Sequence, residues 1–225
     1  MTAPRIRALM LPRPVLAAAG AGVLAFGLPS AASATEVGGG WAGYVASSTT
    51  YTSVTATWTQ PVVKCGSSST ADVATWVGLD GYTSDSVEQI GTEAACEGGT
   101  ADYLAWYELY PNDAVDLAKT VSPGDSVTAT VTATSSTEFT LKIADATKGW
   151  TYSTVQADSS AKRSSAEVVV EVPTELPAAD GGSVTFSGAE INGKSLGAAD
   201  PTKISSTYVS CGSLVGGTGF TCTWE

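Results

Sequence analysis

The side chains of this chain that could do chemistry are carboxylates, amides and hydroxyls, because the sequence contains no histidine. Without His, neither a Ser-His-Asp nor a Cys-His arrangement can form, and metal sites built on imidazole are excluded. No glycine-rich phosphate loop precedes a helical pattern either. The candidate chemistry therefore rests on the Glu, Gln and Trp residues gathered between residues 76 and 111 and around residue 167.

Glu167 is the carboxylate with the most unusual surroundings in the sequence. It lies in the apolar run 164–173, which alternates in hydrophobicity. The members expected on one face of a strand are Ala166, Val168, Val170 and Val172, with Glu167, Val169 and Glu171 on the other. A charge in such a run is costly unless it has a partner, so Glu167 is a candidate catalytic residue. The alternative is a solvated outer-face glutamate, which is our interpretation of Glu171.

Three further features of the stretch 76–111 admit two interpretations each. The neutral amide of Gln89 can donate a hydrogen bond to a developing oxyanion, or Gln89 is an ordinary polar strand residue. Trp106, Glu108 and Tyr110 form either a binding stripe or a second core beneath another layer. Asp80, next to a glycine, is either a ligand of substrate or a turn former.

The elements that would position these residues are short β-strands. The blocks 76–81, 87–92 and 106–111 are rich in β-branched or aromatic residues and are bounded by Gly, Asp, Ser or Pro. Alternation places Val77 and Leu79 on one face of the first block, opposite Trp76, Gly78 and Asp80. The third block divides in the same way, with Tyr107 and Leu109 opposite Trp106 and Glu108. We therefore predict a sheet with one apolar face and one functional face.

The rest of the chain is also predicted to be β-structure. Further strands are expected over residues 41–45, 51–58, 126–134, 139–145, 150–155, 166–172, 183–187, 204–209 and 220–225. Residues 93–101 are expected to form a loop. No helical pattern of useful length and no repeat is present. Many short strands with Gly and Pro turns indicate a β-sandwich or a barrel, and a sandwich with one curved sheet fits best.

Residues 1–34 have the layout of a secretory signal peptide, with Arg5, Arg7 and Arg13, an apolar run over 15–28 and a small-residue site at 32–34. We expect a secreted protein whose single domain covers residues 35–225. Cleavage removes three of the 11 basic residues and none of the 22 acidic ones, which leaves a net charge of −14. Such a protein should not bind nucleic acid or anionic membranes. With few cations to repel one another once carboxylates are protonated, it should tolerate acid.

The exported part contains four cysteines, an even count that suggests two disulfides outside the cell. Of the three possible pairings we favour Cys65–Cys96 with Cys211–Cys222, because each pair flanks or lies on neighbouring strands. A zinc site is disfavoured by the lack of His and of a C-x-x-C spacing.

Taken together, the blocks resemble the glutamic peptidase (eqolisin) family of secreted acid endopeptidases, over nearly all of the exported chain. They follow the order and spacing of that family, and the set is far more specific than any single block. The matching pieces are Trp41-Ala42-Gly43, the Trp58 strand closed by Pro61, Trp76-Val77-Gly78-Leu79-Asp80-Gly81, Gln89-Ile90-Gly91-Thr92, Trp106-Tyr107-Glu108-Leu109-Tyr110-Pro111, Pro123-Gly124-Asp125 and Ala166-Glu167-Val168-Val169-Val170-Glu171.

The resemblance implies an all-β, concanavalin-like jelly-roll sandwich of two antiparallel sheets that acts on protein or peptide substrates. The catalytic glutamine and glutamate of the family match Gln89 and Glu167. The substrate-lining residues that it implies are Trp41, Trp76, Asp80, Trp106 and Glu108. No cofactor or metal is expected, and we expect a monomer.

Two departures from the family pattern bear on these expectations. Val168 stands where the family usually has Trp, but it should face away from Glu167 and alter the core rather than the site. Only residues 35–40 separate the expected cleavage site from the first matching block, so control by a long propeptide is not expected and a bacterial-type member is. The competing hypothesis is carbohydrate chemistry on the same scaffold, with Glu108 and Glu167 as a glycosidase pair. A third hypothesis is a glycan-binding module without catalysis, in which Gln89 and Glu167 hydrogen-bond the ligand.

Overall fold

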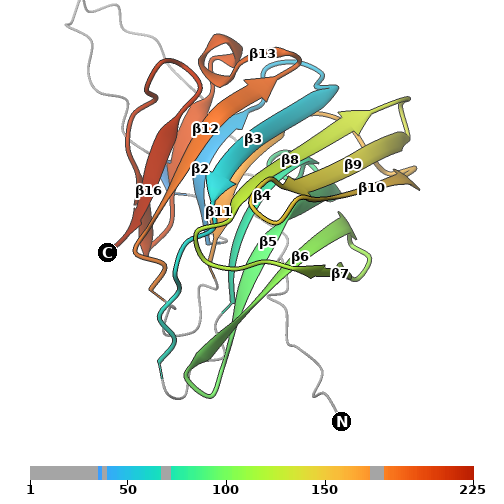
Figure 1. Ribbon diagram of the computed structural model, residues 1–225. Coiled ribbons are helices and arrows are strands. Elements are labelled where there is room, and N and C mark those ends of the chain that lie inside the picture. The colour runs from blue at the N-terminus through green and yellow to red at the C-terminus, as the bar shows by residue number, and fades with distance from the viewer. Residues whose placement is uncertain (1–34, 37–39, 67–71, 173–179) are drawn as a thin grey trace, which may run out of the picture.

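The computed structural model describes residues 35–36, 40–66, 72–172 and 180–225, and nearly all of its regular structure is β-strand. Two sheets pack face to face, as the ribbon shows (Figure 1). The expected signal peptide, residues 1–34, lies outside the described residues. Among the described residues no helix is long and apolar enough to cross a membrane.

The first sheet contains the residues of the predicted functional face. Its strands lie in the order β1-β14-β2-β11-β4-β5-β6-β7. Their bounds are β1 Thr35–Glu36, β14 Thr202–Ser205, β2 Trp41–Ala46, β11 Ala166–Glu171, β4 Asp72–Asp80, β5 Val87–Glu97, β6 Thr100–Tyr110 and β7 Val115–Thr120. All neighbours pair antiparallel except the short β1–β14 contact, which is parallel.

The second sheet covers the other side of the core. Its order is β10-β9-β8-β3-β12-β16-β15, with β13 paired to β12, and all of these pairs are antiparallel. The bounds are β10 Trp150–Ala157, β9 Glu138–Asp145, β8 Ser126–Ala133, β3 Ser53–Thr59, β12 Ser183–Ile191, β16 Phe220–Trp224, β15 Val209–Cys211 and β13 Lys194–Ser195. One 3-10 turn, η1, spans Leu196–Ala199. This two-sheet antiparallel architecture confirms the predicted sandwich.

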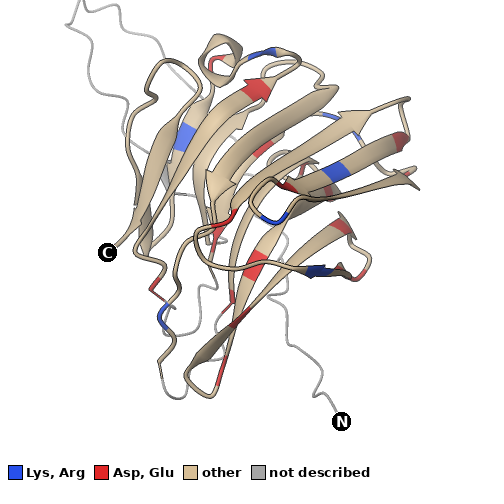
Figure 2. Ribbon diagram, in the orientation of Figure 1, with Lys and Arg blue, Asp and Glu red and all other residues tan. Residues whose placement is uncertain are grey.

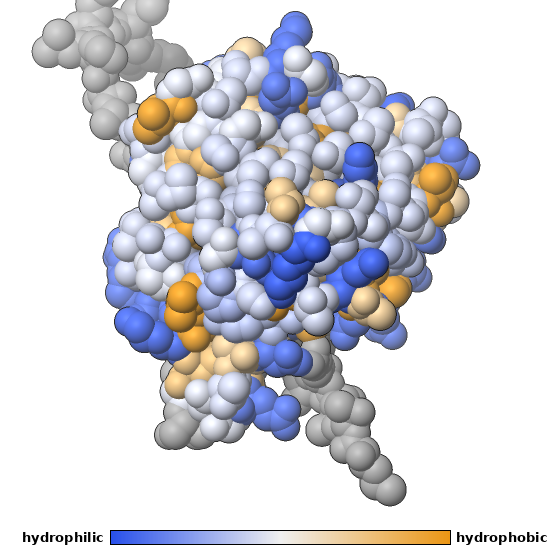
Figure 3. Space-filling view, viewed as in Figure 1, coloured by the Kyte–Doolittle hydropathy of each residue, from blue (hydrophilic) through white to orange (hydrophobic). Residues whose placement is uncertain are grey.

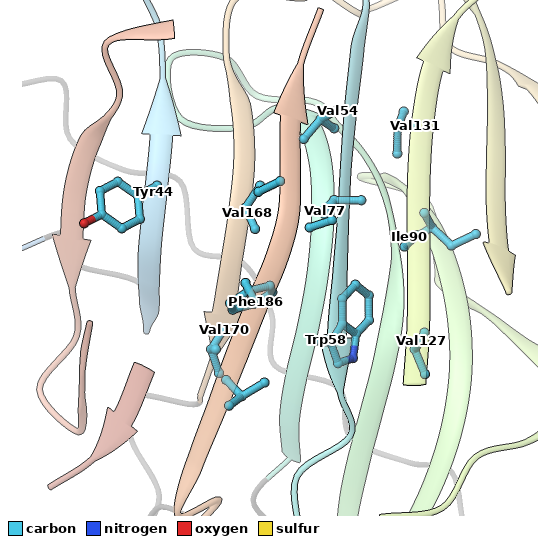
Figure 4. Packing of buried hydrophobic residues seen from close by; sticks show 14 of the residues in the cluster. Tyr44, Val54, Trp58, Val77, Ile90, Val127, Val131, Val168, Val170 and Phe186 are labelled. Atoms are coloured by element: carbon cyan, nitrogen blue, oxygen red, sulfur yellow. The ribbon is translucent and has the colours of Figure 1, made fainter. Parts of the chain in front are cut away.

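The main core fills the space between the sheets, and alternation along each strand decides which side chains enter it (Figure 4). Val77 and Ile90 from the first sheet meet Trp58 and Phe186 from the second. The Nε1–H of Trp58 donates to the hydroxyl of Thr92 across the sandwich at 3.1 Å. The predicted alternation of the strands 76–81, 106–111 and 166–172 is therefore confirmed.

A second, smaller apolar cluster covers the opposite face of the first sheet. Its buried members are Trp41, Val45, Trp76, Val87, Leu104, Trp106, Val169 and Ile204. Trp106 is 4% exposed within this cluster, whereas Glu108 and Tyr110 of the same stripe are only partly buried. The same face also carries polar residues, and these form the candidate site.

Three strand predictions differ from the structure. Residues 93–101 form no long loop, because β5 and β6 continue to a two-residue turn at Gly98 and Gly99, both with positive φ. The alanines and cysteine before that turn have weak strand propensity, but pairing between β4 and β5 holds them in the sheet. The strand β7 was not predicted, and the expected strand 204–209 is divided between β14 and β15.

Both predicted disulfides are present. Cys65 is bonded to Cys96, with a Cα–Cα distance of 5.6 Å. Cys211 is bonded to Cys222, its direct partner in the β15–β16 pair. A bridge of either kind stabilises a small exported domain by about 2–4 kcal/mol.

The charge distribution agrees with the acidic composition. Acidic residues occur along both sheets, whereas basic residues are few and scattered (Figure 2). The face seen in Figure 3 is mainly polar, with small, separate apolar groups. Neither feature resembles the basic surface that nucleic-acid binding requires.

Candidate active site

Glu167 and Gln89 lie in one row across three neighbouring strands. Glu167 on β11 pairs with Gly78 on β4, and Gly78 pairs with Gln89 on β5. Gln89 in turn pairs with Glu108 on β6. Directly paired residues direct their side chains to the same face of a sheet. The row therefore brings a carboxylate, a glycine, an amide and a second carboxylate together on the face opposite the main core.

Gly78 lies between the two expected catalytic residues, and the Trp76 ring packs against it. Strands lie about 4.8 Å apart, so the Cα atoms of Glu167 and Gln89 are separated by about 10 Å, and the residue between them has no side chain of its own. A Cβ at residue 78 would lie 2.8 Å from Cζ3 of the buried Trp76 ring and 3.3 Å from Cβ of Gln89. Glycine is thus required by the tryptophan beside it, and the sequence motif Trp-Val-Gly carries that requirement.

The amide of Gln89 is oriented by Glu108. Nε2 of Gln89 donates to Oε2 of Glu108 at 2.7 Å. Because a carboxylate only accepts, this bond fixes which end of the amide is Nε2. Oε1 of Gln89 is buried and has no hydrogen-bond partner in the part of the chain that the structure describes. The second Nε2 hydrogen and the Oε1 lone pairs remain for a water molecule or a substrate.

Tryptophans surround this row on the same face. Trp76 packs edge-on against Trp41, with ring centroids 4.7 Å apart at 84°. Its Nε1–H donates to Oε2 of Glu171 at 3.1 Å, so Glu171 is partly buried and bonded rather than merely solvated. In the next row, Trp76 and Trp106 lie on either side of Gly91. The structure thus brings Trp41, Trp76 and Trp106 to the same face as Gln89 and Glu167.

Asp80, at the end of β4, is fully buried. Both of its carboxylate oxygens accept hydrogen bonds from the segment that precedes β11. The structure therefore places Asp80 against the protein chain. Asp80 is therefore linked to Glu167 indirectly, through the segment that precedes β11.

Glu88 is a buried residue that the sequence analysis did not single out, although its place in the strand alternation could have identified it. It alternates with Gln89 and so falls on the apolar face together with Ile90, where a carboxylate is unexpected. It is fully buried. Burial first, and then the charges of Asp80 and Asp158 and hydrogen bonding with them, raise the pKa of Glu88 to about 9. Glu88 is therefore protonated at neutral pH.

The described residues offer no metal centre. No group of three or more His, Cys, Asp or Glu side chains in that part of the chain is arranged to hold an ion. The polar groups of the row can bind, orient and protonate a substrate with carboxyl and amide chemistry alone.

The requirement for glycine at residue 78 gives a first testable prediction. Gly78→Ala is expected to displace the Trp76 ring and to narrow the space beside Gln89. Such displacements cost up to about a hundredfold in rate, and we expect kcat/KM to fall about 10- to 100-fold. Overpacking should lower the free energy of unfolding by about 1–3 kcal/mol.

The matched control for this substitution is Gly212→Ala. The nearest atom to an added Cβ there is the carbonyl oxygen of Thr221 at 3.6 Å, an ordinary contact. Peptidase assays and thermal unfolding of both variants test the prediction. Equal kcat/KM for Gly78→Ala and the unmodified protein would contradict it.

Comparison with known proteins assigns this chain to a class of protein. The model of the peptidase A4 family matches residues 39–224, and the chain belongs to that family. It is a glutamic-type peptidase, a hydrolase of peptide bonds. Aspergillopepsin-2 of Aspergillus niger is 32% identical over 196 residues, which are 74% of this chain and 70% of that protein. Scytalidopepsin B of Scytalidium lignicola is 33% identical over 136 residues, 58% of this chain and 50% of that protein.

Solved structures of this class share the fold. Scytalido-glutamic peptidase with a peptide-based transition state analogue has a TM-score of 0.70 and 28% identity, and the match covers 84% of this chain and 99% of that one. SCP-B, described as a member of the eqolisin family in complex with the tripeptide Ala-Ile-His, has a TM-score of 0.66 and 27% identity, with the same coverage. These likenesses confirm the family that the sequence motifs indicated.

Proposed function

We propose that this protein is a secreted acid endopeptidase that cleaves peptide bonds with Gln89 and Glu167 as its catalytic dyad. The observation that carries the proposal is the row Glu167–Gly78–Gln89, which places a carboxylate and an amide on either side of a glycine on one face of the sheet. Membership of the peptidase A4 family supports the reaction class.

The proposed reaction begins with a water molecule between Glu167 and Oε1 of Gln89. The Glu167 carboxylate takes a proton from this water as its oxygen attacks the scissile carbonyl carbon. The free Nε2–H of Gln89 donates to the resulting oxyanion, while Glu108 holds the amide in place. Protonated Glu167 then delivers its proton to the departing nitrogen, and the C–N bond breaks. No covalent intermediate with the enzyme forms.

Activity at acid pH is expected because the proposed general base is a glutamate. The reference pKa of glutamate, about 4.3, lies below that of histidine, about 6.5, so a glutamate is the better suited of the two to act as a base in acid. The neutral amide of Gln89 needs no particular pH. Trp41, Trp76 and Trp106 are proposed to form the substrate-facing surroundings of the dyad, because all three lie on its face of the sheet.

The competing carbohydrate hypothesis is not favoured. A retaining glycosidase needs two carboxyl groups about 5–5.5 Å apart. Glu108 and Glu167 are separated by two intervening strands, and Gln89 lies between them. Glu108 is also bonded to that glutamine, which suits a positioning role better than general acid catalysis.

The proposal is tested by digestion of unfolded casein with the mature chain between about pH 2 and 6. We expect peptide release that is highest in acid and declines toward neutral pH, and no release of reducing sugar from β-glucans. Absence of cleavage over the whole range, or sugar release without cleavage, would overturn the proposed function. Addition of EDTA should change nothing, because no step uses a metal.

A further inference from the structure

Asp80 joins the end of β4 to the segment that leads into β11. Its Oδ2 accepts hydrogen bonds from the backbone N–H groups of Lys162 and Arg163, at 2.8 and 2.6 Å. Its Oδ1 accepts from the N–H and the hydroxyl of Ser164, at 2.8 and 3.0 Å, and from the hydroxyl of Ser84 at 3.0 Å. Three consecutive N–H groups and two hydroxyls thus converge on one buried carboxylate.

This arrangement depends on unusual backbone conformations. Asp80 has φ of 69° and Arg163 has φ of 55°, in a region that residues other than glycine seldom adopt. Such conformations persist where the surroundings fix them. Successive N–H groups that point into one concavity form a binding place for an anion, and here the Asp80 carboxylate fills it. The unusual backbone conformation of Arg163 is therefore coupled to binding of the Asp80 carboxylate.

Further bonds extend the junction to the residue next to β11. The N–H of Asp80 donates to the carbonyl oxygen of Ser165 at 3.0 Å, and the N–H of Tyr82 donates to the Ser165 hydroxyl at 3.3 Å. On the other side, the carbonyl oxygen of Arg163 accepts from the N–H of Tyr51 at 2.9 Å. Ser165 is two residues before Glu167. The position at which β11 begins is therefore set by the Asp80 junction.

We infer that Asp80 is a positioning residue that holds Glu167 at its working distance from Gln89. The inference rests on the proposed dyad and goes beyond it. It differs from the expectation that Asp80 lines the substrate, because all five donors come from the protein chain and the side chain is fully buried. A shift of the segment 162–165 would move Glu167 along or away from β4. Substrate binding by the tryptophans would be affected far less.

The first test is Asp80→Asn, which keeps the shape but turns one acceptor oxygen into a donor that faces N–H groups. We expect kcat per folded molecule to fall about 100-fold, with KM changed less than threefold. Thermal unfolding at the assay pH gives the folded fraction for this correction. A purely structural role would lower the folded fraction and leave corrected kcat unchanged, and that result would overturn the inference.

The matched control is Asp145→Asn. Asp145 is also buried and also accepts a hydrogen bond from a turn N–H, that of Lys148 at 2.9 Å, but it lies in the second sheet away from the dyad. We expect this variant to lose stability without losing corrected kcat. An equal loss of corrected kcat in both aspartate variants would count against a specific role for Asp80.

A milder variant keeps the inference testable if Asp80→Asn does not fold. Combining Ser84→Ala with Ser164→Ala removes the two hydroxyl donors and leaves the three backbone donors in place. We expect kcat to fall about 3- to 10-fold with KM unchanged and with faster amide hydrogen exchange in residues 162–168. Unchanged kcat and exchange would overturn the inference.

Glu167→Gln, assayed in parallel, separates failure of this inference from failure of the proposed function. If Glu167→Gln retains wild-type activity, the dyad itself is wrong. If it is inactive while Asp80→Asn keeps wild-type corrected kcat, the dyad stands and the positioning role of Asp80 is wrong. Where residual activity of Glu167→Gln is measurable, adding Asp80→Asn should lower it no further, because both changes remove the same contribution.

Discussion

Glu167→Gln is expected to abolish nearly all peptidase activity, with a fall in kcat of at least about a thousandfold at every acid pH. Glutamine keeps the volume and the hydrogen-bonding shape of the side chain but cannot take a proton from water. Loss of a general base costs about 10²–10⁴ in rate. The fold should be unaffected in acid, because the variant retains the contacts of β11 with β2 and β4.

Gln89→Ala, the substitution of the other proposed catalytic residue, is also expected to lower kcat strongly. It removes the proposed oxyanion donor, which is worth about 10²–10³ in kcat, and it leaves Glu108 without the amide bonded at 2.7 Å. The double variant should be hardly less active than Glu167→Gln alone, because residues that act as a unit are not additive.

Glu190→Gln is the matched control for both changes. Glu190 is an exposed glutamate on β12, in the second sheet, and its substitution should leave kcat within about twofold of the unmodified protein. Casein digestion and a fluorogenic peptide assay at pH 3–4 measure all of the variants. Substantial turnover by Glu167→Gln would show that another residue serves as the base.

Periodicity of two was sufficient to predict the faces of the strands. Val77 and Leu79 were separated from Trp76 and Gly78 by alternation alone, and the two apolar clusters contain them as expected. Family motifs then identified Gln89 and Glu167, which are 78 positions apart in the sequence. Local pattern and motif order thus led to the correct fold and to one sheet face.

The register between strands could not be predicted in this way. That Gly78 lies between Gln89 and Glu167 depends on pairing of three strands distant in sequence, and periodicity carries no information about which residues meet. The same limit applied to Asp80. Its neighbours in sequence indicated a turn, whereas four of its five hydrogen-bond donors come from residues more than 80 positions away.

The second prediction concerns Glu88 and the loss of stability as pH rises. Its pair partners, Leu79 on β4 and Leu109 on β6, are apolar. Among the described residues, no N–H or hydroxyl group donates to either of its carboxyl oxygens. Burial and the two nearby carboxylates, Asp80 and Asp158, raise its pKa from 4.5 to about 9. A neutral carboxyl that donates to a carboxylate fits these surroundings, and an ionised one does not.

The sign of the effect follows from proton linkage. Below about pH 4.5, Glu88 is protonated in the folded and the unfolded chain alike, so its burial carries no charge penalty. Between that value and about 9, only the folded chain keeps the proton. Unfolding then releases a proton, and the free energy of unfolding falls by about 1.4 kcal/mol for each pH unit. Stability conferred by the protonated group is lost as pH rises through this window.

Glu88→Gln should therefore flatten the dependence of stability on pH. Glutamine can donate a hydrogen bond as the protonated carboxyl does, but it cannot ionise. We expect equal melting temperatures for the two proteins near pH 4. At pH 8, about 3.5 pH units above the lower limit of the window, the unmodified protein has lost about 5 kcal/mol. The melting temperature of the variant should then be about 10–20 °C higher, since each kcal/mol corresponds to about 2–4 °C in a domain of this size. Glu190→Gln again serves as the exposed control. Parallel curves for Glu88→Gln and the unmodified protein would contradict the prediction.

Loss of activity at high pH should accompany this loss of stability. Glu88 is adjacent to Gln89 on β5, and its charge would act on Asp80, whose carboxylate holds residues 162–164 ahead of Glu167. A third negative charge at this point would loosen both sides of the dyad at once. The Glu88→Gln variant is accordingly expected to regain full acid activity after incubation at pH 8, under conditions in which the unmodified protein is inactivated.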